Sequence, residues 1–309
     1  MHHCGRSSSI KDLKGELVEA MVAEFRLRVL GHDMNRSSLR SVFGLRLAAA
    51  VAVVLLSGTQ SSLAQKWAEA TLNKSPRHHE WVDLKHDGRT VKAFLAFPEV
   101  KEKAPAVIVI HEIFGLTDWA KNLADELAAA GYIAIAPDLL TEPGKDTQSY
   151  PDKEAAIKAV SALQDSQVFA DLDAAAKHVS KLKACNGTIV VTGFCWGGGK
   201  SFAYVNHNPD LKAAYVFYGT GPQSAAEAEK IAGPVYGFYG EDDARVDTTI
   251  PKTKEIMGSL GKTYEPVTYP GAGHGFMRAG EAPDATEPNR KAREAAWERW
   301  KTLLKTLGS

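Results

Sequence analysis

Residues 188–199 read Thr-Ile-Val-Val-Thr-Gly-Phe-Cys-Trp-Gly-Gly-Gly, and this stretch decides the fold. The β-branched run at its start is typical of a buried strand, and a helix is predicted from Gly199 to Asn206. Glycines flank Cys195 because a Cβ beside it would collide where a strand turns sharply into a helix. Such a turn strains the cysteine backbone and places the thiol at a helix N-terminus, which favours a thiolate. The pattern therefore predicts a cysteine nucleophile.

Short apolar runs alternate with amphipathic stretches on both sides of this turn. A hairpin is predicted from 80–85 and 90–97, strands at 106–110, 132–136, 188–192, 213–218, 235–239 and 263–269, and helices at 118–130, 153–163, 166–181, 199–206, 248–259 and 288–307. Strands that alternate with helices favour right-handed crossovers. We therefore expect the α/β class, with a mostly parallel doubly wound sheet that carries helices on both faces. No internal repeat or low-complexity linker interrupts residues 65–309, which predicts a single domain there.

The bulk composition excludes several classes of function. Lys+Arg and Asp+Glu both number 37, so the chain has no basic excess to bind nucleic acid or an anionic membrane. The three cysteines form no C-x-x-C pair and no His/Cys spacing typical of a zinc site. We therefore expect neither a disulfide scaffold nor a metal, and a small molecule as the only partner.

The N-terminal 64 residues resemble a targeting segment rather than part of the fold. A basic stretch from Met34 leads into the apolar run Leu47–Leu56, and small residues precede Gln65. These features predict a signal peptide at 34–64, a mature chain that starts at Gln65, and a secreted, periplasmic protein. A membrane anchor is the alternative, but the apolar run is about half the length that spans a bilayer. Residues 1–33 precede the signal without resembling it, which suggests an over-extended start.

A cysteine nucleophile needs a base, and imidazole titrates near neutral pH. His274 lies between glycines in a loop just after the predicted strand 263–269, where parallel sheets present catalytic groups. His111 is a rival only because it is predicted near the same edge. The remaining histidines of the predicted domain are expected at the surface or on helices: His78, His79, His86, His178 and His207.

The segment 239–246, Tyr-Gly-Glu-Asp-Asp-Ala-Arg-Val, follows another predicted strand and offers a carboxylate that could orient the imidazole. The chain order is then nucleophile, acid and base. The pattern alone leaves Asp242 and Asp243 as equal candidates for the acid.

Four motifs together resemble the dienelactone hydrolase family, a carboxymethylenebutenolidase-like branch of the α/β-hydrolase superfamily. They are Gly-Phe-Cys195-Trp-Gly-Gly, Asp243 with Val246 three residues on, Gly-His274-Gly, and the segment His-Glu-Ile-Phe-Gly at 111–115. The similarity extends from about Val91 to Leu307. It implies an α/β-hydrolase fold, cleavage of a lactone or ester without a cofactor, and Asp243 rather than Asp242 as the acid.

The resemblance also implies roles that the spacing does not. Glu112 matches a carboxylate that helps to control ionisation of the cysteine, and the N–H groups of Ile113 and Trp196 match the oxyanion hole. Arg278 matches an arginine that binds the substrate carboxylate. The chain departs from the family at the second substrate-binding arginine, where Lys153 stands. A lysine is a point charge rather than a bidentate fork, so this departure places the dienelactone itself in doubt as the substrate.

The sequence thus predicts a monomeric, cysteine-dependent hydrolase that cleaves a small, anionic lactone or ester through an acyl-enzyme. One alternative is a broad-specificity, short-chain carboxylesterase. Another is a non-catalytic binding protein on the same fold. A thiol redox sensor would need Cys185 as a resolving cysteine, although the sequence predicts that Cys185 lies at the opposite end of its strand from Cys195.

Overall fold

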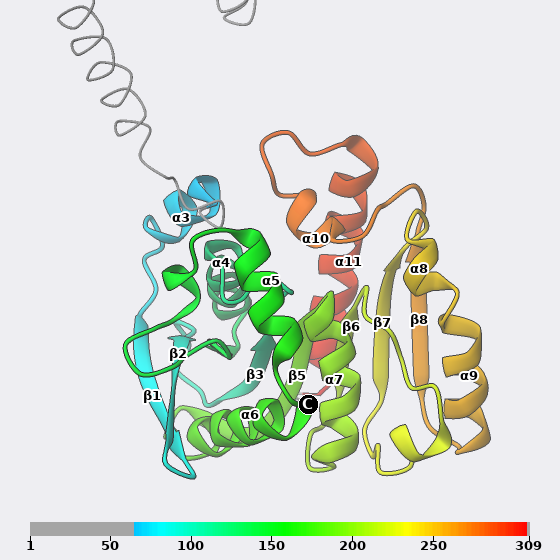
Figure 1. The fold of residues 1–309 in the computed structure, drawn as a ribbon, viewed down its shortest axis with the longest axis horizontal. Helices are drawn as coiled ribbons and strands as arrows, with labels where there is room; N and C mark the ends of the chain where they lie inside the picture. The colour runs from blue at the N-terminus through cyan, green and yellow to red at the C-terminus, as the bar shows by residue number, and fades with distance from the viewer. Residues whose placement is uncertain (1–64, 308–309) are drawn as a thin grey trace, which may run out of the picture. The chain divides into compact units, whose positions relative to one another are not determined.

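Within residues 65–307, which the computed structural model describes, eight strands form one mostly parallel sheet (Figure 1). The strands are β1 (His79–His86), β2 (Arg89–Ala96), β3 (Ala104–Ile110), β4 (Ile133–Pro137), β5 (Cys185–Phe194), β6 (Ala214–Phe217), β7 (Val235–Gly240) and β8 (Tyr264–Tyr269). They are ordered β1-β2-β4-β3-β5-β6-β7-β8. Only the β1–β2 and β2–β4 pairs of this sheet are antiparallel. The predicted α/β class and doubly wound sheet are confirmed, whereas the predictions for residues 1–33 and 34–64 lie outside the described residues.

Helices connect the strands. They are α3 (Lys66–Leu72), α4 (Asp118–Ala129), α5 (Lys153–Ala162), α6 (Asp165–Ser180), α7 (Trp196–His207), α8 (Ala244–Asp247), α9 (Ile250–Ser259), α10 (Phe276–Ala279) and α11 (Glu287–Thr306). The predicted helices agree with these bounds within a few residues, except that α7 begins three residues early. Its first turn contains Gly197 and Gly198, which the sequence analysis placed in the turn before the helix. The sequence did not predict α3, α8 or α10, and α8 and α10 are four residues long, too short to show a helical period.

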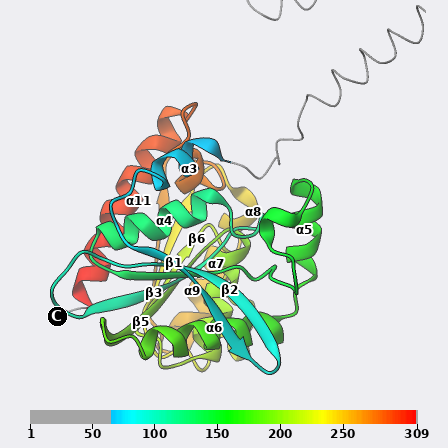
Figure 2. The same ribbon diagram turned by 90° about the vertical axis from the view of Figure 1, so that its left-hand side faces the viewer.

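The sheet buries both of its faces, and alternate residues of β3 show how. Val107 and Val109 pack on the face covered by α4 and α11, where Trp119 and Trp300 are fully buried. Ile108 and Ile110 point to the other face, in one cluster with residues of α6, α7 and α9. Figure 2 shows the strands between these two groups of helices. A strand that is apolar on both faces, as β3 is, therefore sits at the centre of the three layers.

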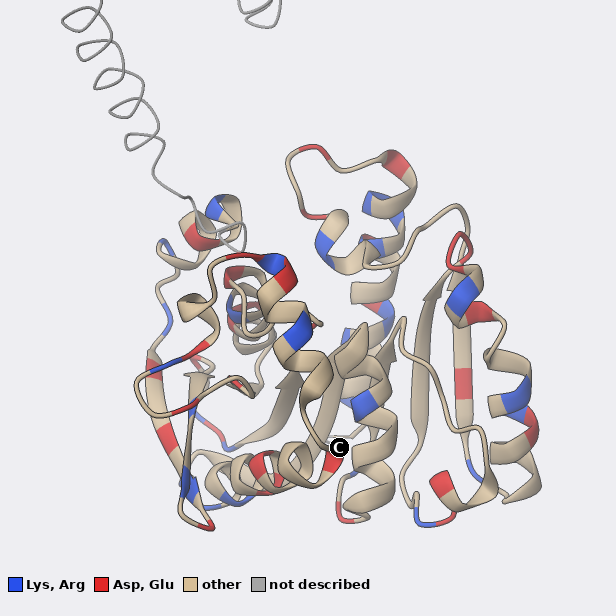
Figure 3. Ribbon diagram, viewed as in Figure 1, with Lys and Arg blue, Asp and Glu red and all other residues tan. Residues whose placement is uncertain are grey.

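Charged residues are interspersed by sign over the helices rather than gathered on one of them (Figure 3). This distribution agrees with the equal numbers of acidic and basic residues in the sequence. Among residues 65–307, no helix combines the length and the apolar character that a membrane crossing requires.

Two of the histidines expected at the surface are instead tied to buried carboxylates, so that expectation was wrong for both. His79 Nε2 lies 2.6 Å from Asp125 Oδ1, and His86 Nε2 lies 2.6 Å from Asp171 Oδ1. Their side chains are 19% and 16% exposed. Their partners lie on helices 46 and 85 residues away, so no local pattern could have revealed them.

Candidate active site

The turn between β5 and α7 holds Cys195 in a strained conformation. The residue has φ of +58°, a value that side chains other than glycine rarely adopt. A Cβ at position 193 would overlap the carbonyl oxygen of Gly197, and a Cβ at 197 would overlap that of His111. Glycine is therefore required at both places because backbone meets backbone there. The thiol, partly exposed, lies directly before the first turn of α7.

His274 and Asp243 form the short hydrogen bond that the sequence proposed. Nδ1 of His274 lies 2.5 Å from Oδ2 of Asp243, and Asp243 is only 6% exposed. The neighbouring Asp242 is exposed, which separates the two candidates that the pattern left equal. On its other side the His274 ring interacts with the side chain of Cys195, which raises the pKa of the imidazole. Because Asp243 occupies Nδ1, the other ring nitrogen, Nε2, remains available for the cysteine.

These contacts change the protonation of His274. Burial lowers the pKa of the imidazole, but its hydrogen bonds and charge interactions with Cys195 and Asp243 together outweigh burial and raise the pKa to about 9. The ring is therefore protonated at neutral pH. An imidazolium beside Cys195 is the arrangement that stabilises a thiolate.

Two backbone N–H groups close to the thiol are available to bind an oxyanion. Within residues 65–307, neither the N–H of Ile113 nor that of Trp196 makes a hydrogen bond. His111 Nδ1 lies 2.7 Å from the carbonyl oxygen of Glu112, which also accepts from the N–H of Gly115. Because the C=O and N–H of one peptide unit point in opposite directions, these bonds turn the N–H of Ile113 the other way.

His111 itself is fully buried and its ring stacks on Trp196, with centroids 5.7 Å apart. Burial is the main cause that lowers its pKa. With Nδ1 bound to a carbonyl and no access to solvent, His111 is poorly placed to act as the base, and His274 has no rival among the residues described at this edge.

Glu112 and Arg278 form an ion pair beside the cysteine. Nε of Arg278 donates to Oε2 of Glu112 at 2.6 Å, and Glu112 is only 2% exposed. Burial lowers the pKa of Arg278, but the Glu112 charge and hydrogen bond outweigh it, so the pKa lies above its usual value. The arginine predicted to bind substrate is thus already bound to a protein carboxylate through one of its nitrogens.

Phe114 links Arg278 to the lysine at which the sequence departs from the family. The guanidinium carbon of Arg278 lies 5.4 Å from the centre of the Phe114 ring, and Nζ of Lys153 lies 5.8 Å from it. Lys153 is the first residue of α5, whereas Arg278 lies in α10, so two separate elements bring their charges to this ring. The sequence analysis gave Phe114 no role, although its place in the 111–115 segment was a signal.

Tyr218 is a second residue that sequence reasoning missed. It follows β6 with φ of +40°, is fully buried, and packs edge-on against the His274 ring with centroids 5.1 Å apart. Burial raises its pKa well above the usual value, so its hydroxyl stays protonated. In the sequence it looked like the last residue of a buried strand.

Cys185 lies at the start of β5 and is buried in the apolar cluster under α6. Ten residues of extended chain separate it from Cys195, about 30 Å. It cannot act as a resolving cysteine, which removes the redox-sensor alternative. Among residues 65–307, no three His, Cys, Asp or Glu side chains gather to hold a metal ion.

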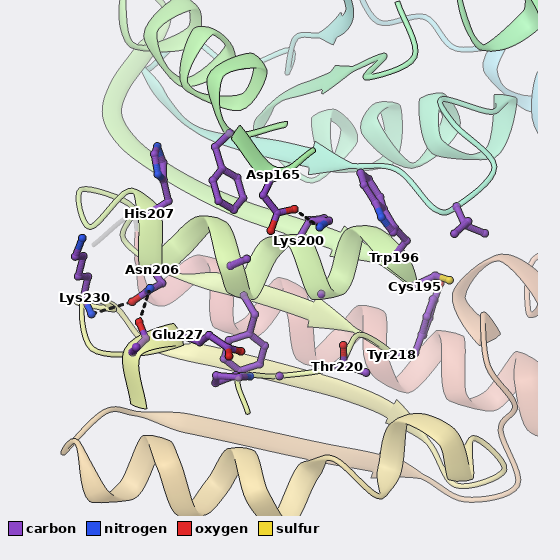
Figure 4. A pocket seen from close by; sticks show the side chains of 18 of the residues that line it. Asp165, Cys195, Trp196, Lys200, Asn206, His207, Tyr218, Thr220, Glu227 and Lys230 are labelled. Atoms are coloured by element: carbon purple, nitrogen blue, oxygen red, sulfur yellow. Dashed lines mark hydrogen bonds and ion pairs between the residues drawn. The ribbon is translucent and has the colours of Figure 1, made fainter. Parts of the chain in front are cut away.

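A cavity of about 840 Å³ opens at Cys195 (Figure 4). Its near end is lined by Ile113, Trp196 and Tyr218, and it extends along α7 to His207. The nucleophile candidate is therefore open to a small molecule.

Comparisons with known proteins agree with this geometry. The family model described as "Dienelactone hydrolase family" matches residues 91–308. A protein of Saccharolobus solfataricus named "Putative carboxymethylenebutenolidase" is 34% identical over 255 residues, which cover 72% of this chain and 96% of that protein. One of the same name from Salmonella typhimurium is 34% identical over 211 residues, 63% of this chain and 76% of that protein.

A solved structure from Klebsiella pneumoniae, described as a "Putative Dienelactone Hydrolase", is also similar. It superposes with a TM-score of 0.65 at 31% identity and covers 74% of this chain and 98% of that one. The predicted family, the α/β-hydrolase fold and the class of carboxylic ester hydrolases are therefore confirmed. The chain belongs to the dienelactone hydrolase family.

Proposed function

We propose that the protein hydrolyses a small lactone or ester by way of a thioester on Cys195. The observation that carries this proposal is that His274 lies between Cys195 and Asp243: its Nδ1 is 2.5 Å from Oδ2 of Asp243, and its interaction with Cys195 raises the pKa of the imidazole. The imidazolium keeps the cysteine as a thiolate, and Asp243 holds the ring in the orientation that the reaction needs.

The reaction has two halves. The Cys195 thiolate attacks the ester carbonyl and forms a C–S bond, and the N–H groups of Ile113 and Trp196 bind the negative oxygen of the tetrahedral adduct. The adduct collapses, the ester C–O bond breaks, and the His274 imidazolium gives its proton to the leaving oxygen. Neutral His274 then takes a proton from water, whose oxygen attacks the thioester. The C–S bond breaks, and the acid product and the thiolate–imidazolium pair result.

The substrate proposed first is a small lactone or ester that carries a carboxylate. Arg278 uses Nε for Glu112, so its remaining N–H groups can pair with an anion, and Lys153 adds a second positive charge near the Phe114 ring. Glu112 would then share Arg278 with the substrate carboxylate.

A broad-specificity, short-chain carboxylesterase is the second candidate. The observation that favours it is the Glu112–Arg278 pair, because a neutral ester leaves this pair intact, whereas an anionic lactone has to compete with a buried carboxylate. The lysine at position 153 also lacks the bidentate geometry that suits a carboxylate. A non-catalytic binding protein is disfavoured by the complete cysteine, histidine and aspartate set.

Arg278→Ala distinguishes these two substrate classes. If Arg278 pairs with a substrate carboxylate, kcat/KM for acidic lactones should fall roughly ten- to a hundredfold while neutral esters change little. Arg278→Lys should restore only part of the loss, because an ammonium cannot replace the fork. A parallel fall for both substrate classes would mean that Arg278 supports the His274 loop, and the carboxylesterase assignment would then take precedence.

We also propose that residues 34–64 direct export to the periplasm and that the mature, monomeric enzyme begins at Gln65. The side-chain oxygen of Gln65 accepts a hydrogen bond of 2.8 Å from the N–H of Trp119, so the first mature residue would be anchored on α4. Fractionation of expressing cells with N-terminal sequencing tests the export, and light scattering tests the monomer. Cytoplasmic protein that retains residue 34 would contradict the proposed export. A stable dimer would contradict the proposed monomer.

A further inference from the structure

The cavity at Cys195 continues as a groove along the outer side of α7. Figure 4 shows Cys195 at one end of this row of side chains and His207 and Lys230 at the other. The groove lies between the start of α6, which contributes Phe169, and the loop after β6, which contributes Pro222. It is therefore longer than the space that a single lactone ring beside the thiol would occupy.

The floor of the groove follows from the helical period of α7. Positions 199, 203 and 206 line the groove and recur on one side of the helix at spacings of three and four. The first two are Gly199 and Ala203, whose small side chains leave a trough where larger residues would stand out. Phe169 and Pro222 add apolar walls to this trough, and the Lys200–Asp165 ion pair lines the same groove.

The far end of the groove is polar and partly closed. Oδ1 of Asn206 accepts a hydrogen bond of 2.8 Å from the backbone N–H of Lys230, and Nδ2 of Asn206 donates one of 3.2 Å to the carbonyl oxygen of Ala226. These two bonds tie the end of α7 to the loop after β6. An apolar chain in the groove would therefore meet polar groups near Asn206.

The side of Cys195 on which the groove lies indicates which half of an ester it would take. The residues that line it include neither His274 nor Arg278. The leaving alcohol has to lie next to His274, because that ring supplies its proton. The acyl half stays bonded to the sulfur of Cys195, where the groove begins.

We propose that this groove binds the acyl arm of the substrate and that the enzyme prefers esters of medium-chain, mainly apolar carboxylic acids. The proposal rests on the cysteine hydrolase function given above and, of its two substrate classes, extends the carboxylesterase to longer acyl chains. From Cys195 to Ala203 the helix rises about 12 Å, which matches an extended chain of roughly eight to ten carbons. Each methylene that enters the open groove loses contact with water on one side only, so it gains about half the free energy of full burial. This gain corresponds to an increase of about twofold in kcat/KM per methylene.

The test is a series of p-nitrophenyl esters, from butyrate to decanoate, assayed with the full chain below the concentrations at which the esters form micelles. Six added methylenes should raise kcat/KM about sixtyfold. A parallel series of acetate esters with lengthening alcohols should show little change. A flat acyl series overturns the proposal, and a rise confined to the alcohol series overturns the assignment of the groove to the acyl arm.

Blocking variants show whether the groove is the cause. Ala203→Trp fills the floor and Ala226→Trp fills the far end beside Asn206, and each should cut the decanoate-to-butyrate ratio at least tenfold. Ala225→Trp is the matched control, because Ala225 is exposed in the same turn and does not line the groove. If both blocking variants have the same decanoate-to-butyrate ratio as Ala225→Trp, the proposal is overturned.

Failure of this inference is distinguishable from failure of the proposed function. If butyrate is cleaved in a Cys195-dependent manner while chain length and the tryptophan variants have no effect, the groove assignment alone fails. If Cys195→Ala retains turnover of butyrate, the cysteine mechanism fails, whatever the chain-length series gives.

Discussion

The pairs His274–Asp243 and His86–Asp171 have nearly the same geometry but lie in different surroundings. In each, a ring nitrogen lies within 2.6 Å of the oxygen of a nearly inaccessible aspartate. The first pair adjoins a strained cysteine at the end of β5. The second joins the β1–β2 hairpin to α6, and Arg89 also donates to Asp171, with Nε at 2.9 Å.

The difference teaches that a histidine–aspartate pair is not a site by itself. Asp171 is bound by an arginine as well as by its histidine, so this carboxylate holds the β1–β2 hairpin against α6. Within residues 65–307, Asp243 has no arginine or lysine partner, and its effect passes through His274 to the thiol. Variants of the two pairs should therefore fail in different ways, one in turnover and the other in stability.

The largest effect is expected at Cys195, which sits beside the first pair only. Cys195→Ala should reduce ester hydrolysis by about 10⁴-fold or more while the thermal midpoint changes by a few degrees, because the side chain lies at the mouth of the sheet. Cys195→Ser should also be poor, since a hydroxyl titrates far above a thiol. Steady-state assays and thermal denaturation measure the two quantities.

Cys185→Ala is the control for this prediction. It removes the buried cysteine at the other end of β5 and should cost stability without loss of turnover. Residual activity of Cys195→Ala above about one per cent would refute the nucleophile assignment.

How much of this contrast the sequence could predict depends on the range of the interactions. The elbow around Cys195 and the strand-end position of His274 are local patterns of glycine and β-branched residues, and both were visible. The Glu112–Arg278 pair joins residues 166 apart and was not predicted, because it depends on how α10 docks on the loop after β3. The choice of Asp243 over Asp242 depends on the direction of one turn. The glycine and strand pattern could not decide it, so the sequence analysis relied on the family resemblance, and the structure decides it by geometry.

Asp243→Asn should cost the next largest amount, about 10²- to 10³-fold in kcat, because an amide can no longer hold the protonated His274 ring. Asp242→Asn should change kcat less than twofold, since Asp242 is exposed. Comparison of the two variants under identical assay conditions measures the difference. Equal losses in both would show that the carboxylate does not act through His274.

Asp171→Asn tests the other half of the comparison. Removal of this charge leaves His86 and Arg89 without their common partner, and breaking a buried ion pair typically costs about 3 kcal/mol in the free energy of unfolding. Denaturant unfolding measures this loss, and kcat should stay within about twofold of the wild type at a temperature where the variant is folded. A large loss of kcat in the folded variant would mean that the hairpin pair communicates with the active site.

The smallest expected effect is the pH dependence of the unfolding free energy that His274 contributes. The pKa of His274 is about 9 in the folded protein against about 6.5 for an unperturbed histidine, so the folded state binds the proton more tightly. The resulting stabilisation is complete below about pH 6.5, declines as the pH rises, and is lost above about pH 9. Because the side chain is 32% exposed, solvent screening reduces the effect to about 1 to 2 kcal/mol.

The wild type should therefore lose about that much more unfolding free energy than His274→Gln between pH 6 and pH 10, since glutamine does not titrate. The interaction with Cys195 supplies part of the raised pKa, so in a Cys195→Ala background the same difference should shrink. Denaturant titrations of the four proteins at the two pH values measure both quantities. If the difference stays equal in the two backgrounds, His274 is held protonated by Asp243 alone, and the thiolate–imidazolium pair on which the first half of the reaction depends does not form in the resting enzyme.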